Sequence, residues 1–265
     1  MQLIKHKYFT RALILCICIC GCKKVIHVQL KNADIQTVIT GEVNDQAGPY
    51  FVNITKTAHF NADNNFQTVS GAIVTITGNG VTDSLTETSP GVYATHTLKG
   101  KPGKSYSLYV SVEGKIYTAT STMPAPVSLD SIDFREGTRD QLYAVANFQD
   151  PKGVSNYYQF IEYANGKKFR NGRGNSVFDD RLSDGRYINR ILYNDSSQIT
   201  PGIRLTVQMN CIDKDVFTYL NELSQISGRS GFSSPAPDNP TSNISGGALG
   251  YFSACSIDSI SMKIP

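Results

Sequence analysis

Tryptophan is absent from this chain of 265 residues, and histidine occurs at only four positions, His6, His27, His59 and His96. No two of these histidines have the spacing of a zinc site, and the H-E-x-x-H pattern of metalloproteases is missing. The sequence also contains no P-loop, no G-x-G-x-x-G nucleotide motif and no G-x-S-x-G nucleophile elbow. The sequence therefore assigns no catalytic residue, no metal ligand and no cofactor.

Long apolar runs are also scarce, and the strongest one lies at residues 12–20, behind a basic stretch at 1–11 that lacks acidic residues. This layout is typical of an export signal, and the run is too short to span a bilayer as a helix. It ends in ICGC, which resembles the lipobox of bacterial lipoproteins. The resemblance implies cleavage after Gly21 and acylation of Cys22, so that residues 1–21 are a lipoprotein signal peptide and acyl chains attach the protein to a membrane.

The cysteines of this run, Cys16, Cys18, Cys20 and Cys22, alternate with Ile and Gly. A metal cluster would need C-x-x-C spacing or polar loop residues between the ligands, so the pattern favours loss of the first three cysteines with the signal. An uncleaved anchor is the alternative. Two other cysteines, Cys211 and Cys255, form an even pair in an exported chain, where a disulfide between them competes with two buried thiols.

Charge of one sign is lacking in the processed chain. Residues 1–21 contain three of the 25 Lys and Arg residues and none of the 22 Asp and Glu residues, which leaves 25 − 3 = 22 basic against 22 acidic residues. A chain of zero formal net charge gives no electrostatic reason to expect nucleic acid as a partner.

The composition is typical of a β-rich protein, because Thr, Ser, Tyr, Val, Ile and Gly are plentiful. Residues 22–36 are expected to form a tether. Short apolar segments separated by turn signals predict an N-terminal β-sandwich over residues 37–125, and its clearest strand is SYSLYVSV at 105–112, where apolar and polar residues alternate. The sequence PAPVS then reads as a linker.

Residues 126–265 are predicted to form a second β-rich domain that contains one helix. Val216, Leu220, Leu223 and Ile226 recur at helical spacing, which predicts a helix near 215–227, with Asp213 or Asp215 at its start. A long loop rich in Gly, Ser, Pro and Asn follows at 228–250, and a final strand is expected over 256–265. The run DDRLSDG contains Asp179, Asp180 and Asp184, and because it lacks the spacing of a calcium loop, we interpret these residues as turn residues.

Several longer stretches are similar to a known family. They are VITGEV, VSGAIVTI, KPGKSYSLYVSVEGKIYTATSTMP, DPKGVSNYYQF, FDDRLSDGRYI and NPTSNISGGALGYFSACS. In this order they resemble the Bacteroidetes outer-membrane lipoprotein family catalogued as domain of unknown function four-two-four-nine. The resemblance implies a lipid-anchored outer-membrane protein, often encoded beside TonB-dependent receptors, with no established activity. The first half is also similar to the small Ig-like or carboxypeptidase-regulatory-like sandwich domains that precede such receptors.

These observations favour a non-catalytic accessory or binding protein that works with a TonB-dependent receptor in nutrient uptake. Both a periplasmic and a surface-facing orientation stay open. The loop at 228–250 is expected to contact a partner or ligand because it contributes no predicted core, and its candidate residues are Asn239, Pro240, Asn243, Ile244, Gly246 and Gly247. Deletion of residues 233–243 should then leave the fold intact. The alternatives are an envelope hydrolase acting on glycan or peptide, and a structural or adhesive surface protein.

Overall fold

Strands from both ends of the chain meet in one sheet. The computed structural model describes residues 34–58, 66–138, 141–169, 176–193, 199–227 and 239–264, which fall within the single compact unit Asp34–Pro265. Its largest sheet runs in the order β12 (Lys167–Lys168), β11 (Tyr157–Ala164), β15 (Arg204–Ile212), β16 (Leu249–Lys263), β1 (Thr37–Asn44), β2 (Phe51–Lys56), β6 (Val92–Ala94) and β5 (Thr86–Ser89). Strand β13 (Ser176–Asp179) also pairs with β11.

Strands β1 and β16 pair in parallel, from Val38 opposite Leu249 to Asn44 opposite Cys255. The other ladders within this sheet are antiparallel. A parallel pair needs a long connection, and here nearly the whole described chain lies between the two strands. The last strand therefore lies beside the first in the interior of the sheet.

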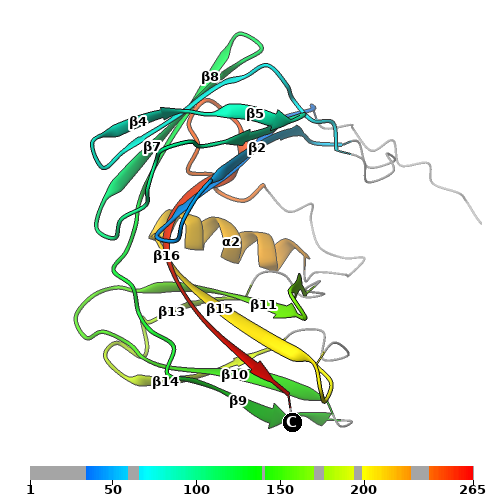
Figure 1. Cartoon of the computed structure of the whole chain (residues 1–265), viewed down its shortest axis with the longest axis vertical. Helices are drawn as coiled ribbons and strands as arrows, with labels where there is room; N and C mark the ends of the chain where they lie inside the picture. Colours follow the sequence, from blue (N-terminus) through cyan, green and yellow to red (C-terminus); the bar gives the residue numbers. More distant parts are fainter. Residues whose placement is uncertain are drawn as a thin grey trace, which may run out of the picture. The chain divides into compact units, whose positions relative to one another are not determined.

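Two smaller sheets pack against this large sheet (Figure 1). The first contains β4 (Val81–Ser84), β3 (Ile73–Gly78), β7 (Ser105–Val112) and β8 (Lys115–Thr122). The second contains β14 (Tyr187–Leu192), β10 (Leu142–Gln149) and β9 (Ser131–Glu136). The alternation predicted for β7 is confirmed, because Tyr106, Leu108, Val110 and Val112 are buried and the residues between them are exposed or half-buried.

One face of the 15-residue strand β16 supplies both hydrophobic cores. Phe252 and Ala254 pack in the first core, between β1–β2 and the β3–β7 sheet, whereas Ile260 and Met262 pack against the second core, under the β10 sheet. These four residues share a face because side chains alternate along a strand. The mainly β, sandwich-like fold is confirmed, with one helix among the described residues, but the closing segment predicted for the second domain belongs partly to the first core.

Helix α2 (Lys214–Ser227) covers the opposite face of β16. It begins where predicted, and the Val216 N–H donates to Asp213 Oδ1 at 2.9 Å, which identifies Asp213 as the cap. Tyr219 and Tyr251 lie with ring centroids 5.2 Å apart where the helix meets the strand.

Within the described part of the chain, no helix has both the length and the apolar character that crossing a membrane requires.

Candidate functional site

The segment 239–248 lies against the first sandwich. Ile244 and Ala248 are buried members of its core. Ser245 bonds to Thr118 of β8 in both directions, with N–H to carbonyl oxygen distances of 2.7 and 3.4 Å. The expectation that this part of the loop contributes nothing to a core is therefore wrong. Sequence reasoning missed it because the segment has no strand periodicity of its own.

Side chains replace a neighbouring strand along the first part of β16. Strand β15 pairs with β16 only from Ser256 onward. Before that point, Asn243 donates from Nδ2 to the Phe252 carbonyl at 2.8 Å and accepts from the Phe252 N–H at 3.0 Å. Two serines act along the same edge, with Ser242 Oγ donating to the Gly250 carbonyl and Ser121 Oγ accepting from the Ala254 N–H. These bonds satisfy buried backbone groups that would otherwise be unpaired.

The two candidate glycines differ in their surroundings. Gly246 has a φ of +97°, and a Cβ atom there would lie 2.4 Å from the Ile116 carbonyl oxygen. Gly247 has a φ of +83°, but a Cβ atom there would meet nothing within 4 Å. Gly246 is thus required by close backbone packing. Of the predicted partner residues, Asn239, Gly246 and Gly247 are exposed, Pro240 and Asn243 are half-buried, and Ile244 is buried. Asn239 and Pro240 are accessible and make none of the packing contacts described above.

Cys211 and Cys255 are buried free thiols that face opposite sides of the large sheet. Cys211 lies directly across from Ser256 in the β15–β16 ladder, so Cys255, one position earlier, points away from it. Cys211 packs in the second core and Cys255 beneath helix α2, and burial raises the pKa of both thiols. Of the two alternatives that the sequence left open, the structure therefore shows two buried thiols and not the disulfide. Gly21 and Cys22, the predicted processing site, lie outside the described residues.

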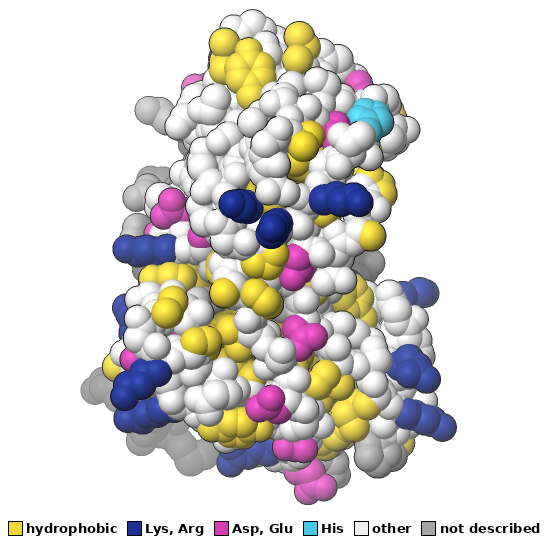
Figure 2. All heavy atoms as spheres, turned by 60° about the vertical axis from the view of Figure 1, so that its left-hand side comes forward, with side chains coloured by type: hydrophobic (Ala, Val, Ile, Leu, Met, Phe, Trp, Pro, Cys, Tyr) yellow, Lys and Arg dark blue, Asp and Glu magenta, His cyan; other side chains and the backbone are white. Residues whose placement is uncertain are grey.

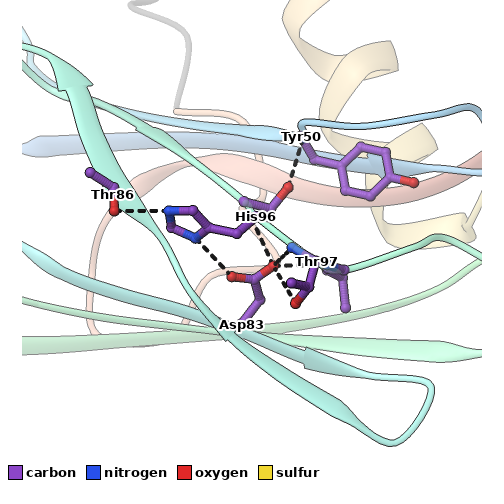
Figure 3. A network of polar contacts seen from close by, with 7 residues as sticks. Tyr50, Asp83, Thr86, His96 and Thr97 are labelled. Atoms are coloured by element: carbon purple, nitrogen blue, oxygen red, sulfur yellow. Dashed lines mark hydrogen bonds and ion pairs between the residues drawn. The ribbon is translucent and has the colours of Figure 1, made fainter.

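Asp83 holds a polar network together at the edge of the first sandwich (Figure 3). Its side chain is almost fully buried and accepts the backbone N–H groups of His96, Thr97 and Leu98 at 2.9, 2.6 and 2.8 Å. Burial opposes ionisation of this carboxyl, but the N–H donors outweigh it and lower the Asp83 pKa to about 2. The carboxylate therefore anchors the turn at residues 96–98.

The same network places a hydroxyl, an imidazole and a carboxylate in sequence. His96 Nδ1 lies 3.2 Å from Asp83 Oδ1, and His96 Nε2 lies 3.0 Å from Thr86 Oγ1 (Figure 3). This order is that of the relay in serine hydrolases. The relay was missed in the sequence because no spacing rule connects Asp83, Thr86 and His96.

A groove of about 310 Å³ crosses β1 and β2 on the face of the large sheet that also carries helix α2. Its floor and walls include the alternate residues that point away from the first core, Thr40, Glu42, Asn44, Phe51, Asn53 and Tyr251. Phe51 is 45% exposed, and Asn44 Nδ2 donates to Glu42 Oε1 at 3.0 Å. A half-exposed ring beside amide, carboxylate and hydroxyl groups can bind a small polar ligand by stacking and hydrogen bonds.

Charges of both signs share the surface. On the face in Figure 2, acidic side chains follow the middle of the lower half and basic side chains lie mainly toward its sides. This distribution agrees with the equal numbers of basic and acidic residues in 22–265, and this face offers none of the broad basic area that binds a nucleic-acid backbone.

The comparison with protein families decides the assignment. A family model described as "Domain of unknown function (DUF4249)" matches residues 24–261. The chain belongs to this DUF4249 family. The match includes nearly all of the described residues, so both sandwiches and helix α2 are part of the family domain. No curated protein sequence matches the chain.

Proposed function

We propose that this DUF4249 protein is a lipid-anchored outer-membrane accessory or binding protein that works with a TonB-dependent receptor in the uptake of an unidentified nutrient. The observation that carries the binding role is the polar groove over β1 and β2, where Phe51 and Asn53 project from a rigid sheet. The lipobox sequence before Cys22 supports the membrane attachment.

The ligand can be sought by thermal unfolding of the protein in the presence of oligosaccharides and short peptides. A ligand of the groove should raise the melting temperature of the wild type, and Phe51→Ala should abolish that shift. Tyr109→Ala is the matched control, because Tyr109 is a similarly exposed ring in the first sandwich that is not among the groove-lining residues. An equal ligand-induced rise in melting temperature in the wild type and in Phe51→Ala would contradict binding in the groove.

The receptor partnership can be tested by affinity capture from detergent-solubilised outer membranes. Because Asn243 is structural, the deletion of residues 233–243 is unsuitable. A double substitution of Asn239 and Pro240 by alanine instead probes an accessible part of the segment. We expect the wild type to recover a TonB-dependent receptor and the double variant to recover less. Capture of no such receptor by the wild type would refute the partnership.

The Thr86–His96–Asp83 relay is the one observation that favours an envelope hydrolase as a second candidate function. The Asp83 carboxylate accepts backbone N–H groups of the turn at residues 96–98, which favours a structural role for this residue. Assays of wild type and His96→Gln against ester and peptide substrates separate the two. Turnover by the wild type that disappears in His96→Gln would support the hydrolase function. Background rates that are equal in the two proteins would support the binding role.

A further inference from the structure

Three carboxylates from separate parts of the chain meet at the end of the second sandwich. Asp150 follows β10, Asp180 follows β13, and Asp184 lies in the turn before β14. One oxygen from each lies within 4.8 Å of an oxygen from both of the others. The sequence showed only the pair in DDRLSDG, because Asp150 comes from a strand of the opposite sheet.

This cluster concentrates negative charge in a buried place. Asp150 and Asp180 are 1% and 3% exposed, whereas Asp184 is exposed. None of the ion pairs among the described residues involves these three carboxylates. The arrangement is thus electrostatically unfavourable unless a cation offsets it.

A fourth oxygen donor, the side chain of Asn156, lies on the same face of the sheet as Asp180. Asn156 is the residue directly opposite Asp180, since Tyr157 pairs with Asp179 and the Asp180 N–H donates to the Asn156 carbonyl. Opposed residues in an antiparallel ladder project to the same face. Tyr158, two residues on and therefore also on that face, donates its hydroxyl to Asp150 at 2.6 Å.

The Asn156 side chain is 93% buried, and its Oδ1 atom has no hydrogen-bond partner. An amide oxygen left unpaired in the interior is costly, and such groups call for an explanation. A cation bound by the carboxylates would satisfy this oxygen. The unpaired amide oxygen is a second observation, separate from the carboxylate cluster, that a bound cation would explain.

We propose that Asp150, Asp180 and Asp184, with the side-chain oxygen of Asn156, form a calcium site. All four donors are hard oxygens, with no nitrogen or sulfur, which suits Ca²⁺ rather than Zn²⁺. Mg²⁺ dehydrates reluctantly and fits poorly where two of the ligands are buried.

The carboxylates also brace the local backbone. Asp150 accepts the Gly185 N–H at 2.9 Å, and Asp184 accepts the Gly153 N–H at 2.7 Å. These bonds hold the ligands in place without exhausting them, because each carboxylate offers about four lone-pair sites. The ion would tie the β10–β11 connection to the turn at residues 180–185, whose Leu182 side chain is 92% exposed.

Terbium luminescence tests the site directly. Tb³⁺ replaces Ca²⁺ among oxygen ligands and is sensitised by nearby aromatic rings, and in this chain without tryptophan Tyr158 is beside the site. Full-length protein freed of metal with EDTA should show a saturable signal at a single equivalent of Tb³⁺. Ca²⁺ should displace it and raise the melting temperature of the protein, and Mg²⁺ should do neither.

Two substitutions make the test specific. Asp184→Asn removes an exposed ligand and should weaken Tb³⁺ and Ca²⁺ binding by about tenfold or more. Asp179→Asn is the matched control, because Asp179 pairs with Arg181 at 2.8 Å and lies outside the cluster. The proposal is overturned by the absence of saturable binding, by equal losses in both variants, or by displacement with Mg²⁺ as readily as with Ca²⁺.

Discussion

Replacing Asn243 by alanine should destabilise the first sandwich. The substitution removes two hydrogen bonds to Phe252, at 2.8 and 3.0 Å, and leaves the N–H and carbonyl of a fully buried residue unpaired. An unsatisfied buried backbone group costs about 1–3 kcal/mol, so we expect the free energy of unfolding to fall by about 2–4 kcal/mol. For a domain of this size the melting temperature should drop by about 5–10 °C.

The assay is urea and thermal unfolding followed by circular dichroism, with Asn239→Ala as the matched control. Asn239 is exposed, so its substitution should change the free energy of unfolding by less than about 0.5 kcal/mol. Near-equal stabilities of the Asn243→Ala and Asn239→Ala proteins would refute the reasoning that Asn243 takes the place of a strand beside β16.

Three other predictions concern stability and thiol chemistry. Because the Asp83 pKa is held at about 2, below the usual 3.8, its ionised form should stabilise the fold by about 2 kcal/mol above pH 5. That contribution should disappear as the pH falls from about 5 to 2, and acid titrations should show a shallower loss in Asp83→Asn. Gly246→Ala should lower the melting temperature more than Gly247→Ala, since only the former clashes with a backbone oxygen, and equal effects would contradict this packing. An alkylating reagent should modify neither Cys211 nor Cys255 in the folded protein and both in urea without reductant, whereas protection in urea would indicate a disulfide.

The spacing of apolar residues was sufficient to predict an element wherever that element buries one face against a single core. Strand β7 alternates between a core and solvent, and helix α2 places Val216 and Leu220 on one buried stripe. In both cases the period of the apolar residues equals the period of the backbone, so the sequence alone predicts the element and its buried face. Of the two predicted caps, Asp213 and Asp215, the structure uses Asp213, and a local signal was sufficient here because a cap bonds to residues a few positions away.

Long-range pairing left no such local signal. Strand β16 is longer than the predicted final strand because its first part serves one core and its last part another. Polar Ser253 and Ser256 are also buried along it, which interrupts the apolar pattern. Its parallel partner β1 lies at the other end of the chain. The approach of Asp150 to Asp180 likewise depends on how two sheets stack. Such contacts follow from topology, which the spacing of residues does not encode.

The mass of the mature protein purified from the membranes of its native host tests the central claim most directly. Lipid attachment predicts a chain that begins at Cys22 and carries acyl groups on its sulfur and its amino nitrogen. A chain that retains residues 1–21, or one that begins at Cys22 with an unmodified thiol, would contradict the lipid anchor and remove the basis for placing this DUF4249 protein beside an outer-membrane receptor.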